Sequence, residues 1–274
     1  MTVAEIRGKI SDTGSNLSER MEDLLTSDIF GCMQYLPARK VLVPFLRAAS
    51  SFHGNVLSIS ESPVNVRYLF WPWLESEGCR PCEPDVLLVI ETEEHNIHLI
   101  VIEAKYYSGL SSEEDERPEP NDQLARELDN LKALNPLSLG LGNNLEVISR
   151  SLLFVTQDMA IPRELLARSL NAYERKKDKV GDIYWASWRF LPDILEKQLT
   201  TVESPEQSAV MNDMLTLLRK KMLFMFSGIK PVTLELRAID FKFYSVTSQT
   251  YRWPNLNIVK PIEYTYKPPA GHSH

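Results

Sequence analysis

Cysteine is scarce in this chain, with only Cys32, Cys79 and Cys82 among 274 residues. A number this small and odd excludes a disulfide framework as the source of stability. Cys79 and Cys82 form one CxxC pair, but a zinc site takes about four ligands, and the nearby candidates are limited to Cys32, His95 and His98. We therefore interpret the three thiols as buried or idle groups.

Long hydrophobic runs are absent as well. No stretch approaches about 18 consecutive apolar residues, the length of a candidate membrane span. The opening residues Met1-Thr2-Val3-Ala4-Glu5-Ile6 lack the basic and apolar regions of a signal peptide. We expect no membrane partner and a cytoplasmic location.

Positive charge is in deficit, because 30 Lys and Arg stand against 37 Asp and Glu for a net charge of −7. Proteins that bind nucleic acid over their whole surface are usually basic, so a nucleic-acid-binding region here has to be a local patch. Each candidate patch is more typical of a solvated helix face than of a phosphate track. The candidates are Arg39, Lys40, Arg47 and Arg67; Arg175, Lys176, Lys177 and Lys179; and Arg219-Lys220-Lys221.

What the sequence does have is the composition of an ordinary globular protein, with 43% hydrophobic and 24% charged residues. The apolar periodicity predicts an alternation of helices and strands. Helices are expected over residues 16–26, 37–49, 122–134, 162–175, 192–199 and 205–226, and strands over 64–74, 86–90, 97–102, 151–155 and 183–188.

This order indicates an α/β fold with a mixed sheet and helices on both faces. Residues 1–200 are expected to form one domain, because the regular alternation of elements ends there. Residues 201–274 are expected to be a C-terminal helical and irregular extension, rich in aromatic residues and of unknown role, with a strand-like fragment at 238–244. The acidic, proline-bearing segment 111–121 is expected to be a mobile loop.

Two short strings carry the chemistry of the chain. Glu83-Pro84-Asp85 opens the apolar run 86–90, and Glu103-Ala104-Lys105 closes the apolar run 97–102. A hairpin that turns near Asn96 brings Asp85 and Glu103 close enough to share one cation. Charged residues at strand ends are common, but a carboxylate and a lysine where a buried strand should stay apolar break the pattern, and such breaks tend to be functional.

The predicted site is a divalent-metal centre. Oxygen ligands favour a hard ion, Mg²⁺ or Mn²⁺, held by Asp85, Glu103 and the backbone carbonyl of Ala104. Because side chains alternate along a strand, Lys105 lies on the same face as Glu103 and points toward the water or phosphate beside the metal. It can orient or deprotonate the attacking water, or offset charge in the transition state. This is the chemistry of phosphodiester hydrolysis.

Two further residues are candidates for the site. Gln123 opens the helix after the acidic loop, with Glu127 one turn along the same face, and its amide can bind the attacking water or a phosphate. Glu22, on the polar side of the first helix, can reach the metal through a water. For both, an ordinary solvent-exposed helix residue is the competing interpretation.

These residues resemble the motifs of the PD-(D/E)XK nuclease superfamily, which has the restriction-endonuclease-like fold. Pro84-Asp85 and Glu103-Ala104-Lys105 match its two acidic motifs, and Gln123-Leu124-Ala125-Arg126-Glu127 is similar to a helix motif of several subfamilies. The string from Glu22 to Gly31 is similar to the first-helix signature of uncharacterised bacterial members. The resemblance covers residues 15–200 and implies an αβββαβ core.

The resemblance implies a Mg²⁺-dependent nuclease in which Asp85 and Glu103 ligate the metal, Lys105 is the catalytic lysine, and Gln123 and Glu22 support the site. The expected partner is a nucleic acid, with DNA favoured over RNA, in a restriction, defence or mobile-element context. Double-strand cutting would need two sites and hence a homodimer. The alternatives are a catalytically silent binding or regulatory module of the same fold, and a structural subunit that docks through C-terminal aromatic segments.

Overall fold

The computed structural model describes residues 17–60, 63–112, 116, 119–142, 145–177 and 182–225, apart from the side chains of 17–20 and 176–177. The chain divides into two compact units, Met1–Phe226 and Ser227–His274. The second unit lies outside the described residues, and so does the predicted strand at 238–244. Part of the predicted loop 111–121 also lies outside them. The division of the chain at residue 200 stays a prediction.

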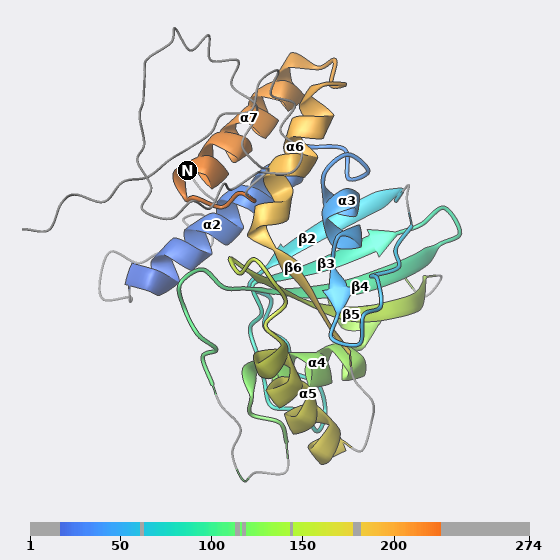
Figure 1. Ribbon diagram of the computed structural model, residues 1–274. Coiled ribbons are helices and arrows are strands. Elements are labelled where there is room, and N and C mark those ends of the chain that lie inside the picture. The colour runs from blue at the N-terminus through green and yellow to red at the C-terminus, as the bar shows by residue number, and fades with distance from the viewer. Residues whose placement is uncertain are drawn as a thin grey trace, which may run out of the picture. The chain divides into compact units, whose positions relative to one another are not determined.

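A six-stranded mixed sheet forms the centre of the first unit, in the order β1-β6-β5-β4-β3-β2 (Figure 1). Neighbours from β2 to β4 are antiparallel, whereas β4, β5 and β6 run parallel to one another. The strands are β1 (Ser50–Ser51), β2 (Asn65–Phe70), β3 (Val86–Glu91), β4 (Asn96–Ala104), β5 (Glu146–Thr156) and β6 (Ile183–Ser187). The predicted α/β class with a mixed, helix-flanked sheet is confirmed.

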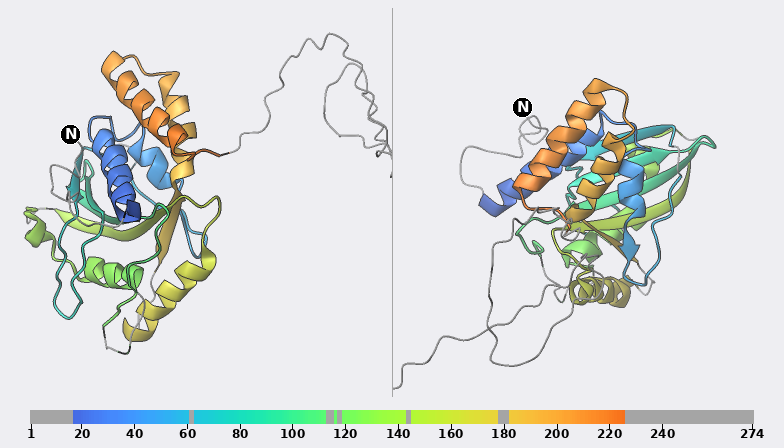
Figure 2. Two further views of the ribbon diagram at one scale, coloured as in Figure 1. Left: turned by 90° about the vertical axis from the view of Figure 1, so that its left-hand side faces the viewer. Right: turned by 45° about the horizontal axis from the view of Figure 1, so that its top comes forward.

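Helices cover both faces of this sheet (Figures 1 and 2). On one face pack α2 (Leu17–Met33), α3 (Leu42–Arg47), α6 (Leu191–Leu199) and α7 (Pro205–Lys220), and on the other α4 (Gln123–Ala133) and α5 (Arg163–Lys177). Two short 3-10 helices, η1 (Pro136–Leu139) and η2 (Trp188–Phe190), complete the described elements. None of the described helices is long and apolar enough to cross a lipid bilayer.

The two cores are separated by the alternation of side chains along β4. Ile100, Ile102 and Ala104 join the core under α2, whereas Leu99 and Val101 join the core under α4. Because alternate residues of a strand share a face, the next residue of the second series is Glu103. The strand therefore directs the Glu103 side chain toward α4. On that face, Glu103 is the first charged residue after the apolar side chains of Leu99 and Val101.

Several predicted element boundaries differ from the structure. The helix predicted over 37–49 is wrong in its start: the α-helix is only α3 (Leu42–Arg47), and residues 38–41 form turns. It is Pro44, not Pro37, that occupies the first helical turn, where its missing N–H is not needed. In contrast, α2 continues past residue 26 to Met33, because Ile29, Phe30 and Met33 extend its buried stripe.

The strand predicted over 64–74 also ends early, at Phe70. The next residue, Trp71, has a φ of 46°, which leaves the extended region, and Pro72 follows it. The Trp71 N–H still donates to the Asp85 carbonyl at 2.9 Å, so the chain leaves the sheet beside the start of β3.

Candidate metal centre

Asp85 lies at the start of β3 because the apolar run after it is buried on both faces of the sheet. The register pairs Val86 with Ile102, so Asp85 faces the end of β4 that carries Glu103. Its Oδ2 accepts a hydrogen bond of 2.8 Å from the Ala104 N–H. Because a strand residue directs its N–H and C=O to the same neighbouring strand, the Ala104 carbonyl also faces Asp85. The hairpin thus brings Asp85, Glu103 and Ala104 together.

Lys105 follows β4 and keeps the strand's pairing, since its N–H donates to the Val155 carbonyl at 2.8 Å. Its Nζ lies 2.7 Å from Oε1 of Glu103 and 3.0 Å from Oε1 of Glu22. Lys105 is 9% exposed, Glu103 2% and Glu22 7%. Lys105 therefore joins two nearly buried carboxylates that come from opposite faces of the sheet.

Glu22 reaches the cluster from α2, the helix on the face opposite α4. Its Oε2 accepts a hydrogen bond of 2.9 Å from the Tyr106 N–H and a second from the Ser108 hydroxyl. With Oε1 on Lys105, both carboxylate oxygens are engaged. Glu22 thus ties α2 to the segment that follows Lys105. Neither Tyr106 nor Ser108 has a sequence signal that marks it as a site residue.

The ligand atoms of Glu22, Asp85 and Glu103 all lie within 4.8 Å of one another. Within the part of the chain that the structure describes, these three residues form a group that could hold a metal ion, and the group includes neither cysteine nor histidine. Three buried carboxylates beside one ammonium leave a surplus of negative charge, which is costly unless a cation offsets it. All the donors are oxygen atoms, so the arrangement fits a hard cation such as Mg²⁺ or Mn²⁺.

Gln123 holds the cluster from the α4 side. Its Nε2 donates to Oε1 of Glu103 at 2.5 Å and to Oε1 of Glu127 at 3.2 Å. Its Oε1 accepts from the Ser111 N–H at 2.7 Å, which fixes the orientation of the amide. Asp122 caps α4 through the Ala125 N–H and sets the helix start at this point. Gln123 is therefore a buried bridge and not an exposed helix residue.

Glu127 is a member of the cluster that the motif analysis placed near the site without assigning it a role. It is 1% exposed, and its Oε2 is buried with no hydrogen-bond partner among the described residues. The sequence signal was its position one turn after Gln123 on the same helix face. Burial distinguishes it from the exposed carboxylates of other helices.

Burial and charge displace the pKa values of these groups in different directions. Burial, and then the neighbouring Glu103 carboxylate, raise the pKa of Asp85 well above its usual range. The same two causes raise the pKa of Glu127. Burial alone would lower the pKa of Lys105, but Glu103, Glu22 and Asp85 together raise it above its ordinary value. Without a bound cation, Lys105 is therefore the positive charge of the cluster.

The cysteines take no part in this arrangement as ligands. Cys32, Cys79 and Cys82 form no disulfide, and burial raises the pKa of the Cys32 and Cys82 thiols, which keeps them protonated. His98, considered as a zinc ligand, lies at the opposite end of β4 with its Nδ1 2.6 Å from the Ser149 hydroxyl. Of the three thiols interpreted as buried or idle, Cys82 is buried, whereas Cys32 and Cys79 are half-buried.

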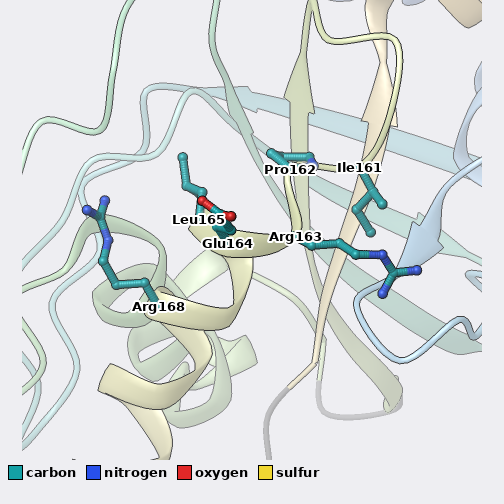
Figure 3. A pocket seen from close by; sticks show the side chains of 6 residues that line it. All are labelled: Ile161, Pro162, Arg163, Glu164, Leu165 and Arg168. Carbon is teal, nitrogen blue, oxygen red and sulfur yellow. The ribbon is translucent and has the colours of Figure 1, made fainter.

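An open hollow of about 780 Å³ lies elsewhere, at the start of α5. Arg163 and Arg168 extend to opposite sides of it, with Glu164 and Leu165 between them (Figure 3). It contains none of the carboxylates of the cluster.

Comparison of the chain with protein-family models, with curated proteins and with solved structures gives no match. The chemistry of the carboxylate cluster is therefore the basis for any functional assignment.

Proposed function

We propose that this protein is a Mg²⁺- or Mn²⁺-dependent nuclease of the PD-(D/E)XK type that hydrolyses phosphodiester bonds, with DNA as the expected substrate. One observation carries the proposal. Glu22, Asp85 and Glu103 come from three separate elements and place their ligand atoms within 4.8 Å of one another, with Lys105 in contact with two of them. The elements α2, β2, β3, β4, α4 and β5 follow one another in that order, with α3, β1 and η1 inserted between them, and this supports the αβββαβ core of that superfamily.

Asp85, Glu103 and Glu22, with the Ala104 carbonyl, would hold the cation. When bound, it would lower the pKa of a water and neutralise charge on the phosphoryl oxygens. Ala104 N–H fixes the rotamer of Asp85, and Gln123 fixes that of Glu103, so two of the ligands are held in place before a substrate arrives. Such preorganisation is what electrostatic catalysis requires.

Lys105 is the group that would act on the reacting atoms. With Glu103 and Glu22 engaged by a cation, its Nζ would turn toward the attacking water or a phosphate oxygen. Its raised pKa keeps it charged in the metal-free protein. We therefore assign it charge stabilisation of the phosphorane-like transition state, with orientation of the water as its second role.

The test is a cleavage assay with the purified full chain on single-stranded DNA, duplex DNA and RNA, in Mg²⁺, Mn²⁺ or EDTA. We expect cutting in either metal and none in EDTA. Asp85→Asn and Lys105→Met are expected to reduce the rate at least roughly 100-fold, the scale of losing a catalytic group. Glu146→Gln and Lys197→Met, on exposed residues of β5 and α6, are matched controls that keep wild-type activity. Intact substrates in both metals would contradict the proposal.

A second candidate is a catalytically silent module of the same fold that serves a larger complex. It is favoured by the ion pairs of Lys105, which already engages both Glu103 and Glu22, so that the cluster is partly neutralised internally. Calorimetric titration with Mg²⁺ separates the two candidates. Metal binding that Asp85→Asn abolishes favours the enzyme, whereas no heat and no cleavage favour the silent module.

A further inference from the structure

Two large aromatic side chains are exposed next to the carboxylate cluster. Trp73 and Tyr107 are each 65% exposed, although aromatic rings of this size are mostly buried in folded proteins. Their backbones are 34 positions apart in the chain and leave the sheet from different strands, Trp73 after β2 and Tyr107 after β4. Exposed rings at a site, unlike scattered ones, point to a binding role.

Each ring belongs to a segment whose backbone contacts a residue of the cluster. The Trp71 N–H donates to the Asp85 carbonyl at 2.9 Å, so Trp73 follows two residues after that contact. The Tyr106 N–H donates to the Glu22 carboxylate at 2.9 Å, and Tyr107 is the next residue. In the sheet, β2 and β4 lie on either side of β3, and both end at the edge where Asp85 precedes β3, so the two segments flank the residue of the cluster that β3 carries.

The backbone beside both rings is held in an unfavourable conformation. Trp71 has a φ of 46° and Tyr107 a φ of 66°, in the left-handed region that bulky residues rarely adopt. At Tyr107 this turn leaves Tyr106 buried at 3% exposure while its neighbour is directed outward, with the ring centroids 4.3 Å apart. Such strain persists where the surrounding contacts over-determine it, and it is concentrated at functional sites.

A cationic side chain, Arg126, belongs to α4, the helix that carries Gln123 and Glu127. Arg126 is half-buried, and its Nε has no hydrogen-bond partner among the described residues. It acts electrostatically on Cys82, whose backbone pairs with Leu74, the residue after Trp73. Arg126 thus belongs to the same helix as Gln123 and Glu127 and lies near the segment that pairs with the one carrying Trp73. A half-buried guanidinium on this helix fits a phosphate.

From these observations we infer that Trp73 and Tyr107 are stacking platforms for unpaired nucleobases, with Arg126 on a neighbouring phosphate. The preferred substrate is then a strand with unpaired bases, either single-stranded DNA or a frayed duplex end. This inference rests on the proposed nuclease function. In an intact duplex the bases stack on one another and cannot offer their faces to side chains, whereas an unpaired strand offers a face from every base. A flexible single strand can also bend to reach carboxylates that are no more than 7% exposed.

Binding without cleavage tests the inference directly. Fluorescence anisotropy in EDTA compares a labelled single strand of about 20 nucleotides, several times the smallest single-strand site sizes, with the blunt duplex of the same sequence. We expect the single strand to bind at least roughly tenfold more tightly. Trp73→Ala and Tyr107→Ala should each raise its Kd roughly 5- to 150-fold and leave duplex binding unchanged. Trp73→Phe and Tyr107→Phe, which keep a ring, should stay near the wild-type value.

Tyr35 provides the matched control. It is 78% exposed but follows the far end of α2, roughly 16 Å of helix beyond Glu22. Tyr35→Ala should bind both DNA forms like the wild type. Arg126→Gln should weaken single-strand binding uniformly across sequences and reduce the slope of log Kd against log salt by roughly one phosphate contact, about 0.7. Single-strand binding by Trp73→Ala and Tyr107→Ala equal to the wild type would overturn the inference.

Cleavage assays on the same proteins separate this inference from the proposed function. If Trp73 and Tyr107 are needed for single-strand binding and no metal supports cutting, the stacking sites stand and the nuclease does not. If wild type and both alanine variants cut single strands and duplex at equal rates, the nuclease stands and the stacking sites do not.

Discussion

Lys105 and Glu22 are 83 positions apart in the chain, yet Nζ of the lysine lies 3.0 Å from Oε1 of the glutamate. Lys105 extends β4 of the central sheet, and Glu22 belongs to α2, which packs on one face of that sheet. Glu103 lies on the other side of the ammonium, at 2.7 Å. The lysine is therefore the charge that compensates two nearly buried carboxylates in the absence of a metal ion.

This arrangement predicts a metal-dependent stability defect for Lys105→Met. Removing the ammonium leaves Glu103 and Glu22 uncompensated, which is expected to lower the free energy of unfolding by about 3–5 kcal/mol in EDTA. Saturating Mg²⁺ should recover a large part of that loss, because a cation bound to the same oxygens supplies the missing charge. Urea unfolding with and without Mg²⁺ measures both values. Lys197→Met, on the exposed face of α6, is the control; equal defects of Lys105→Met in the two buffers would contradict the assignment.

Asp85→Asn is predicted to stabilise the metal-free protein while abolishing its response to metal. Burial and the Glu103 charge raise the pKa of Asp85, so its ionised form is unfavourable in the folded state. Asparagine keeps an oxygen that can accept the Ala104 N–H. We expect a gain of about 1 kcal/mol in EDTA, of the kind found when a strained functional group is removed.

Thermal melts in EDTA and in a Mg²⁺ series test this prediction. The wild type should gain about 2.7 kcal/mol when Mg²⁺ reaches 100 times its Kd, and Asp85→Asn should gain nothing. Glu146→Gln removes an exposed carboxylate from β5 and should behave like the wild type in both buffers. A variant that is less stable in EDTA and still responds fully to Mg²⁺ would show that Asp85 is not a ligand.

Glu127→Gln is predicted to flatten the pH dependence of stability. The pKa of Glu127 is raised by burial and by Glu103, whereas in the unfolded chain it is near 4.3. Between these two values the native state holds a proton that the unfolded state has released, so stability falls as the pH rises through that window. Glutamine mimics the protonated side chain and removes the fall. The variant should therefore be more stable than the wild type at pH 8, on the order of 1–2 kcal/mol, with little difference near pH 4.

Chemical unfolding of both proteins at pH 4, 6 and 8 in EDTA measures this difference. Glu164→Gln, on the exposed first turn of α5, serves as the control, because Glu164 is exposed and lies outside the carboxylate cluster. Parallel pH profiles for Glu127→Gln and the wild type would mean that Glu127 is ionised in the native state at neutral pH.

The part of the site on the β3–β4 hairpin could be predicted from sequence because one local pattern fixes it. The two apolar runs set the register, and the register places Asp85 opposite the end of β4. Alternation then puts Lys105 on the face of Glu103. The contact of Glu22 with Lys105 depends on how α2 packs against the sheet, which no local pattern determines, so the sequence offered Glu22 as a candidate for the site but not as a partner of Lys105.

Buried polar residues are the part that periodicity misses. The helix over 122–134 was predicted, but Glu127 and Asn130 are buried beside its apolar residues Leu124, Leu128 and Leu131. Asn130 accepts from the Ser76 N–H and donates to the Arg80 carbonyl, so it packs a loop and not a hydrophobic core. From sequence alone, a polar residue on a helix is expected to face solvent unless its partner is known. The partners of Asn130 lie about 50 residues away in the chain.

The boundaries of two strands, β1 and β2, were also not predicted. The two-residue strand β1 is too short to carry a period, and it exists because Ser50 and Ser51 pair with Trp185 and Tyr184 of β6. The early end of β2 at Phe70 coincides with the left-handed φ of Trp71 and with Pro72. For β1 a tertiary pairing decides the boundary and the local sequence does not contain it, whereas for β2 the sequence contains the proline and the predicted strand ran past it.

Tyr107→Gly provides a last test, because it separates the strain at this position from the use of the ring. Tyr107 has a φ of 66°, a conformation that costs a non-glycine residue about 1–3 kcal/mol and glycine nothing. The variant loses the ring contact with Tyr106 and gains chain entropy in the unfolded state, so its free energy of unfolding should be unchanged or higher by up to about 1 kcal/mol. If the strained backbone is maintained to present the ring to unpaired bases, this same variant should lose single-strand binding as fully as Tyr107→Ala does. Urea unfolding and anisotropy on one protein sample measure the two effects. A variant that is strongly destabilised and binds the single strand normally would mean that Tyr107 serves the fold and not the substrate.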